Sequence, residues 1–323
     1  MPEQDAGGDL YLSDVSPKDK PWDKHRASAD RVQAIYSNCD YSRYAERMGL
    51  CSQQLGFALE AQDTGELRLR LRQARFCRVR FCPTCQWRRS MMWRARFFKV
   101  LPKVLEEHPK ARFLFLTLTV RNCPVEELRD TVKLMNAAWK RLSERKRFPA
   151  QGWIKAIEVT RNDKTGFAHP HIHAILMVKP SYFSGKTYIK QSEWVELWQS
   201  CLRADYRPGV DVRTVKPKDA APDDAASAGL LGALLETFKY GVKPSDLVAD
   251  GSWLIEVTNQ LHKTRAVAIG GILRNYLSEE DPEDLIHGDE NPEEEEEEVS
   301  EVDELLWVGW REMVQRYAKI AKK

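Results

Sequence analysis

Three histidines alternate with other residues in the segment His169-Pro170-His171-Ile172-His173. In an extended chain every second side chain lies on the same face, so the three imidazoles share one face of the predicted strand. Neutral imidazoles one strand step apart bind divalent metal ions when a carboxylate or another histidine completes the site. The other four of the seven histidines are scattered along the chain, and this concentration favours a metal site over a mildly polar strand.

The predicted strand over residues 152–160 offers a carboxylate to these histidines. The sequence Asn-Asp-Lys-Thr-Gly that follows it is typical of a turn, so the two strands should form a β-hairpin. Counting back from this turn pairs Thr160 with His169 and Glu158 with His171, and directly opposed residues share a face about 5 Å apart. We therefore expect Glu158 to join His171 and His173 around one ion. A register shift of one residue would turn Glu158 to the other face.

Four of the seven cysteines have the spacing of a second metal site. The tight turn Cys82-Pro83-Thr84-Cys85 points two thiolates at one tetrahedral ion, Cys77 precedes it by five residues, and Cys51 is our choice for the fourth ligand. A redox pair is the alternative, but no strand–helix pattern of the thioredoxin type surrounds the motif. The sequence therefore predicts structural Zn²⁺ rather than a disulfide framework.

The net charge of +2 conceals a strong separation of charge along the chain. Residues 279–304 hold sixteen acidic side chains and no Lys or Arg, which leaves 50 basic and 32 acidic residues elsewhere. Residues 67–105 contain twelve Lys or Arg and no acidic residue. A cationic body indicates a polyanionic partner, above all nucleic acid, although a solvated basic face has the same composition. The arginines threaded among the cysteines are candidates for phosphate contacts: Arg78, Arg80, Arg88 and Arg89.

Composition and periodicity divide the chain into five segments. We predict a flexible N-terminus (1–27), a helical and zinc-binding basic module (28–105), a domain that carries the histidines (106–277), an acidic linker (278–304) and a C-terminal amphipathic helix (305–323). The acidic linker is either a solubilising spacer or a mimic of phosphate over the basic surface.

The histidine domain should be an α+β structure. Strands over 112–120, 152–160, 169–178 and 210–215 are separated by a helix over 125–146, the predicted hairpin turn, and a helix over 191–204. This order predicts a ferredoxin-like fold with a central antiparallel β-sheet flanked by helices, beside the small cysteine zinc module.

A short helix over 230–241 brings together two side chains that can do chemistry. Glu236 and Tyr240 are four residues apart, so the carboxylate neighbours the phenol ring, and Lys243 falls on the same side. Gly241 and Pro244 end the helix. By itself such a polar helix face is usually solvated surface, and only the nearby histidines give it a functional interpretation.

Over residues 45–277 the chain resembles the rolling-circle replication initiators of small bacterial plasmids, within the HUH endonuclease superfamily. The resemblance rests on the ordered combination of Phe113-Leu-Phe-Leu-Thr-Leu-Thr119, the histidine–hydrophobic–histidine motif His169-Pro-His-Ile-His173 and the nucleophile motif Glu236-Thr-Phe-Lys-Tyr240. The cysteine segment followed by Gln-Trp-Arg-Arg is also similar to the N-terminal part of this family. The single tyrosine with a partnering glutamate resembles one branch of the superfamily.

The resemblance implies an HUH endonuclease catalytic domain over 106–277, which acts as a metal-dependent nickase and strand transferase at a plasmid origin. Tyr240 would attack the scissile phosphorus, giving a 5′-phosphotyrosine and a free 3′-hydroxyl. Glu236 would end the cycle by activating water or positioning a second cleavage, so that the DNA is rejoined or released. Lys239 and Lys243 are candidates for lowering the pKa of the tyrosine.

The same resemblance implies that His171, His173 and Glu158 hold Mg²⁺ or Mn²⁺, with His169 as a further ligand or as a DNA contact. The implied partners are origin DNA, single-stranded or as a hairpin, and the host helicase and replication machinery. The chain lacks an 18-residue apolar run and a signal-like start, so we expect a soluble protein of the bacterial cytoplasm with no membrane partner.

Three alternatives share parts of this pattern. An HUH transposase or relaxase would use the same chemistry for another purpose. A non-catalytic zinc-containing DNA-binding regulator explains the arginines but leaves the histidines, Glu236 and Tyr240 without a role. A metal-dependent hydrolase would activate water without a covalent intermediate.

Overall fold

The computed structural model describes residues 10–61, 65, 67–215, 227–238, 241–278, 285–286 and 305–320. The chain forms two compact units, of which unit 1 comprises Met1–Ala95 with Pro282–Lys323 and unit 2 comprises Arg96–Asp281. Lys239, Tyr240 and most of the acidic linker lie outside the described residues. Among the described residues, no helix combines the length and the apolar character that crossing a bilayer requires.

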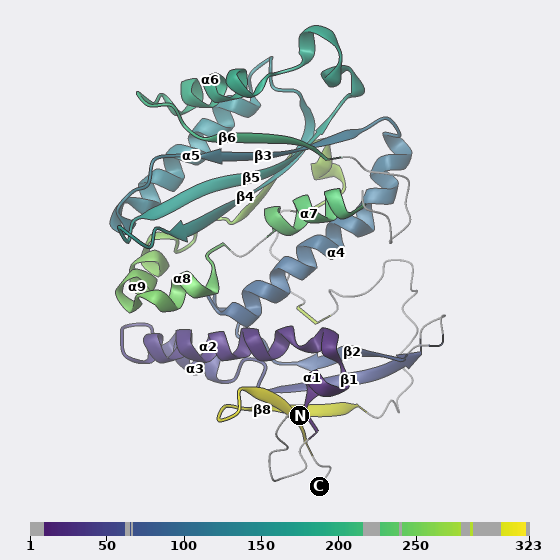
Figure 1. Cartoon of the computed structure of the whole chain (residues 1–323), viewed down its shortest axis with the longest axis vertical. Helices are drawn as coiled ribbons and strands as arrows, with labels where there is room; N and C mark the ends of the chain where they lie inside the picture. The colour runs from purple at the N-terminus through teal and green to yellow at the C-terminus, as the bar shows by residue number, and fades with distance from the viewer. Residues whose placement is uncertain are drawn as a thin grey trace. The chain divides into compact units, whose positions relative to one another are not determined.

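Unit 2 is built on a five-stranded antiparallel sheet in the order β6-β3-β5-β4-β7 (Figure 1). Its strands are β3 (Arg112–Thr119), β4 (Ala150–Arg161), β5 (Ala168–Val178), β6 (Val210–Val215) and β7 (Val267–Gly271). The predicted hairpin is the β4–β5 pair. Strand β5 occupies the centre of the sheet, and its apolar residues are buried on both faces, as an inner strand requires.

Helices cover both faces of this sheet. They are the second part of α4 (Pro83–Glu107), α5 (Leu128–Ser143), α6 (Gln191–Leu202), α7 (Ser227–Thr237), α8 (Pro244–Ala249) and α9 (Gly251–Gln260). The α5 residue Trp139 packs against Trp153 and Lys155, the odd-numbered side of β4. Helix α7 lies on the other face of the sheet from α5 (Figure 1). Its residue Glu236 approaches His173 on that face, where even-numbered β4 residues point.

Unit 1 contains a four-stranded antiparallel sheet in the order β2-β1-β8-β9. Its elements are α1 (Leu12–Val15), α2 (Pro21–Ser37), α3 (Ser42–Gly49), β1 (Gln54–Ala61), β2 (Leu67–Ala74), β8 (Leu306–Arg311), β9 (Arg316–Lys319) and the first part of α4. Trp22 of α2 packs edge-on against Phe57 and Tyr317, which joins the helix to both halves of the sheet.

The predicted amphipathic helix over 305–323 is wrong, because residues 306–319 form the β8–β9 hairpin. The apolar residues recur at helical spacing, but Val308 and Trp310 also alternate as a strand requires, and both are buried. Met313, which would lie on the apolar helix face, is 98% exposed between the two strands. Hydrogen bonding to β1 decides in favour of the strand, and that partner is distant in the sequence.

The predicted flexible N-terminus over 1–27 is also wrong for its described residues, 10–27. Leu12 and Trp22 are buried in the core of unit 1, and Pro21 occupies the first turn of α2, where a proline costs no hydrogen bond. The helical part of the predicted 28–105 module consists of most of α2, α3 and most of α4. Strands β1 and β2 within the 28–105 module were not predicted.

Candidate functional site

Glu158, His171 and His173 meet on one face of the β4–β5 hairpin. Glu158 lies directly opposite His171, and Thr160 opposite His169, so the register predicted from the turn is confirmed. The Glu158 Oε2 atom lies 3.0 Å from His171 Nε2 and 3.1 Å from His173 Nε2. All three side chains are buried, and their potential ligand atoms lie within 4.8 Å of one another. This group could hold a metal ion.

Neighbouring groups orient both imidazole rings so that Nε2 faces the carboxylate. His171 Nδ1 lies 3.2 Å from the His169 carbonyl oxygen, which can only accept, so Nδ1 carries the hydrogen and Nε2 of the neutral ring is an acceptor. His173 Nδ1 lies 3.1 Å from Thr117 Oγ1, and its ring stacks on Phe115. The His171 Nε2 acceptor that faces the carboxylate needs a proton or a cation between them, and a divalent cation fits this set of ligand atoms.

His169 lies beside this group rather than in it. Its Nδ1 lies 2.5 Å from Asn122 Oδ1, and its ring centroid is 5.3 Å from that of His171. Burial, followed by the proximity of His171, lowers the pKa of His169. His169 is therefore placed at the edge of the site, next to the loop that follows β3.

Glu236 of α7 approaches the same group, with its Oε1 atom 3.8 Å from His173 Nε2. Tyr240 and Lys239 lie outside the described residues, but the chain is described again from Gly241. The Gly241 carbonyl oxygen accepts a 2.8 Å hydrogen bond from the backbone N–H of Val159, the neighbour of Glu158. The described chain thus lies close to the Glu158–His171–His173 group on both sides of positions 239–240. Lys243 directly precedes α8.

Cys51, Cys77, Cys82 and Cys85 form a second buried group, which could also hold a metal. Sulfur–sulfur distances are 3.8 Å from Cys51 to Cys82 and 3.6 Å from Cys85 to both Cys51 and Cys77. Four thiolates about 2.3 Å from a tetrahedral ion would lie about 3.8 Å apart, so the spacing fits. Hydrogen bonds from the other three thiols lower the pKa of Cys85, whereas burial raises the pKa of Cys82.

The four arginines predicted to contact DNA differ in their surroundings. Arg88 is fully buried, and its guanidinium donates 2.7 Å hydrogen bonds to the carbonyl oxygens of Leu285 and Ile286. Arg89 donates to the carbonyl oxygens of Arg78 and Arg80. Arg88 is therefore closed to a DNA phosphate in this structure, whereas the Arg78 side chain is exposed.

Three residues that orient the histidines were missed by the sequence analysis: Phe115, Thr117 and Asn122. Thr117 lies opposite His173 because β3 pairs with β5. Phe115 and Thr117 lie within the motif Phe113–Thr119, but their contact with His173 could be inferred only once the pairing of β3 with β5 was known.

A family model described as "Replication protein" matches residues 68–318, a span that includes both cysteine and histidine groups apart from Cys51. The chain belongs to the Rep_1 replication protein family. Its membership agrees with the predicted resemblance and extends it through the β8–β9 hairpin, which the matched residues include.

Curated relatives of this family are similar over most of their length. The chain is 35% identical to "Protein rep" of Streptococcus pneumoniae serotype 2 over 288 residues, which are 85% of this chain and 86% of that protein. It is 34% identical to "Protein rep" of Lactiplantibacillus plantarum, with coverage of 90% and 93%. It is 33% identical to "Protein rep" of Lentilactobacillus hilgardii, with coverage of 95% and 98%. No solved structure matches the chain.

Proposed function

We propose that this protein initiates rolling-circle replication of a bacterial plasmid by nicking single-stranded DNA at the double-strand origin. The observation that carries the proposal is the convergence of Glu158, His171 and His173 on one face of a hairpin, with Glu236 beside them. Membership of a replication protein family supports the biological setting. A zinc-containing regulator would need neither the buried histidine group nor the adjacent carboxylate.

The architecture of unit 2 supports a ferredoxin-like HUH fold. Its histidine strand, β5, lies between β3 and β4 at the centre of an antiparallel sheet, with helices on both faces. Helix α7 carries Glu236, the first residue of the nucleophile motif, to 3.8 Å from His173 Nε2 on the face of the sheet that holds the histidines.

His171, His173 and Glu158 would hold Mg²⁺ or Mn²⁺ at this site. When bound, such an ion polarises the scissile phosphate and offsets negative charge in the transition state. The Tyr240 hydroxyl loses its proton as its oxygen bonds to phosphorus, and the bond to the 3′ oxygen breaks. That oxygen takes up a proton and becomes the 3′-hydroxyl that primes synthesis, while the 5′ end stays on the tyrosine.

Glu236 acts at the end of the cycle. Its carboxylate lies at the edge of the histidine group and is partly exposed, so a water molecule can reach it. As a general base it activates water, or positions a second cleavage, to release or rejoin the DNA. Lys239 or Lys243 assists the first step by lowering the pKa of Tyr240. Origin DNA, the host helicase and the replication machinery are the partners of this cycle in the bacterial cytoplasm.

The cysteine group holds structural Zn²⁺. Four buried sulfurs at tetrahedral spacing leave no open position for a substrate, which is the arrangement of structural zinc sites. Cys51 follows α3, Cys77 follows β2 and Cys85 lies in the first turn of α4, so an ion held by the four cysteines would fix the basic segment between β2 and α4.

The test is the capture of the covalent intermediate. Purified protein is incubated with Mn²⁺ and end-labelled single-stranded origin oligonucleotides, and adducts that survive denaturation are resolved by electrophoresis. We expect an adduct for the wild type and none for Tyr240→Phe, while Tyr276→Phe, which lies elsewhere in unit 2, keeps it. An adduct that persists in Tyr240→Phe would overturn the nucleophile assignment.

A further inference from the structure

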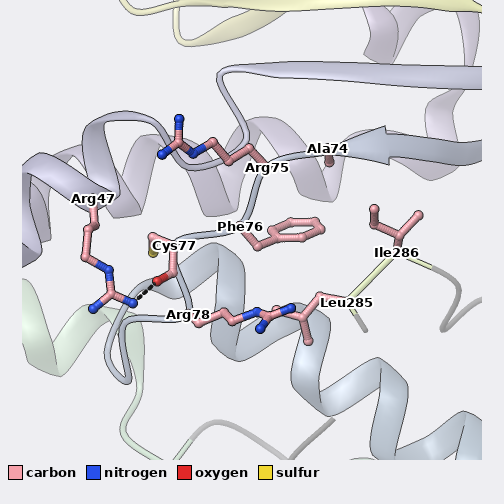
Figure 2. Close-up of a pocket in the computed structure, with 8 residues that line it drawn as sticks. All are labelled: Arg47, Ala74, Arg75, Phe76, Cys77, Arg78, Leu285 and Ile286. Carbon is pink, nitrogen blue, oxygen red and sulfur yellow. Dashed lines mark hydrogen bonds between the residues drawn. The ribbon is translucent and has the colours of Figure 1, made fainter. Parts of the chain in front are cut away.

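A cavity of about 490 Å³ lies in unit 1 beside the cysteine group. It is lined by Arg47, Ala74, Arg75, Phe76, Cys77, Arg78, Leu285 and Ile286, and none of these residues is acidic. The side chains of Arg47, Arg75 and Arg78 are all exposed. Figure 2 shows the Phe76 ring in the middle of this lining, with Arg75 above it, Arg78 below it and Ile286 to one side. Three cations around one opening attract an anion.

The backbone of residues 75–78, which carries Arg75 and Arg78, is held by hydrogen bonds from residues outside this segment. The Arg75 carbonyl oxygen accepts a 2.6 Å hydrogen bond from the Ser52 N–H, and the Cys77 carbonyl oxygen accepts one from the Arg47 guanidinium (Figure 2). The Arg78 carbonyl oxygen accepts a 2.8 Å hydrogen bond from Arg89. Arg78 also adopts a left-handed backbone conformation with φ of 57°. The guanidinium groups therefore project from a fixed segment, which lowers the entropy lost on binding.

The opposite wall is fixed as well. Arg88 holds the carbonyl oxygens of Leu285 and Ile286, and the Leu285 side chain is buried. A rigid opening lined by arginines and one aromatic ring suits a phosphodiester, because guanidinium groups form paired hydrogen bonds with phosphate oxygens.

We propose that this cavity is a second DNA site, which binds the phosphodiester backbone independently of the nicking chemistry in unit 2. The proposal deepens the proposed function by assigning part of the DNA contact to unit 1. Arg75 and Arg78 carry the contact, while Arg47 contributes charge and holds the segment. Phosphate contacts bind without regard to base sequence, so the site fixes DNA on the protein rather than selecting the origin.

The experiment measures DNA affinity by fluorescence anisotropy over a range of salt concentrations. Every protein carries Tyr240→Phe, so binding is read without cleavage, and failure of the nicking mechanism would leave this measurement intact. The probes are a labelled duplex and a labelled single strand, both of arbitrary sequence. The test variant is Arg75→Gln with Arg78→Gln. The control is Arg31→Gln with Arg43→Gln, two exposed arginines of α2 and α3 that do not line the cavity.

We expect the test variant to bind at least about tenfold more weakly at low salt, with a salt slope smaller by about 2 because two phosphate contacts are lost. The control should change affinity by less than about threefold, since distant exposed charges are screened. Arg75→Lys with Arg78→Lys should restore the salt slope and part of the affinity, because lysine keeps the charge but not the paired hydrogen bonds, and this recovery excludes misfolding as the cause. If the test variant loses affinity only for the duplex, the site binds duplex DNA. If it loses affinity only for the single strand, the site binds the opened strand.

If DNA affinity falls equally in the test and control variants, the loss reflects only the lower net charge of the protein, and the proposal is overturned. Unchanged affinity would do the same. Tighter binding by the test variant would mean that the cavity holds the chain's own acidic segment, and this too would contradict it.

Discussion

Glu158 and His171 lie directly opposite one another on β4 and β5, with Glu158 Oε2 3.0 Å from His171 Nε2. The same carboxylate oxygen lies 3.1 Å from His173 Nε2, so one atom serves two imidazoles. Glu158 is therefore the only acidic residue within the three-residue group, and its carboxylate supplies the charge that would attract a cation.

Glu158→Gln should lower the Mn²⁺ affinity of unit 2 by at least about tenfold, because the amide keeps the shape but not the charge of the carboxylate. Binding can be followed by electron paramagnetic resonance, in which the signal of free Mn²⁺ decreases as the ion is bound. The matched control is Glu126→Gln, which removes an exposed carboxylate from the same unit. Equal affinities for the Glu158→Gln variant and the wild type would remove Glu158 from the metal site.

Glu236→Gln should still form the covalent adduct but release it about 10²–10⁴ times more slowly, the range for loss of a general base. A time course of adduct formation and decay measures both steps. Glu256→Gln on α9 provides a carboxylate control. Normal decay of the adduct in Glu236→Gln would mean that another group ends the cycle.

Cys51→Ser should lower zinc affinity by at least about tenfold, since one of four thiolates is replaced by a poor ligand. Zinc per chain, measured by atomic emission after dialysis against a chelator, should fall well below one. Cys39→Ser is the matched control, because Cys39 is a free cysteine that does not belong to the group. Retention of zinc by the Cys51→Ser variant would show that the other three cysteines suffice.

His25→Phe should make the stability of the protein less sensitive to acid. Burial, with a smaller contribution from Lys24, lowers the pKa of His25 from 6.5 to about 4, and its ring stacks on Trp87. Between these values the unfolded chain binds a proton that the folded chain does not, so stability is lost as pH falls from 6.5 towards 4. The loss between pH 7 and pH 5 is about 2 kcal/mol.

Urea unfolding at pH 7 and pH 5, followed by tryptophan fluorescence, gives this difference for the wild type and for His25→Phe. Phenylalanine preserves the stacking on Trp87 but cannot be protonated. Other groups that titrate in this interval are common to both proteins, so the smaller pH dependence of the variant isolates His25. Identical pH dependence would mean that the pKa of His25 is the same in the folded and the unfolded chain.

Local sequence was sufficient for the histidine hairpin. The turn Asn162–Gly166 and the two-residue period of a strand together set the register, and the observed pairing of Glu158 with His171 follows from them. The cysteine group was predictable for the same reason, since thiolate spacing in a tight turn is a local property and Cys77 lies nearby. Cys51, between α3 and β1, lies close to the other three cysteines only because of the tertiary fold.

Long-range pairing was not predictable. The spacing of Leu306, Trp310 and Tyr317 fits a helix as well as a strand, and only hydrogen bonding to β1 selects the strand. Arg88 lies in a basic segment and was predicted to contact DNA. Its hydrogen-bond partners are instead the carbonyl oxygens of Leu285 and Ile286, almost two hundred positions away. The contacts of Thr117 with His173 and of Asn122 with His169 could be identified only from the pairing of β3 with β5.

The pairing of β1 with β8 also has a consequence for biosynthesis. Gln54 lies opposite Gly309, so the ribosome must translate all of unit 2, which ends at Asp281, before β1 receives this neighbour. Unit 2 can collapse while the growing polypeptide is still attached, whereas the sheet of unit 1 stays open at one edge. A messenger truncated before residue 306 would therefore yield a chain with an intact histidine sheet and an unprotected β1 edge, a substrate for proteases and for aggregation.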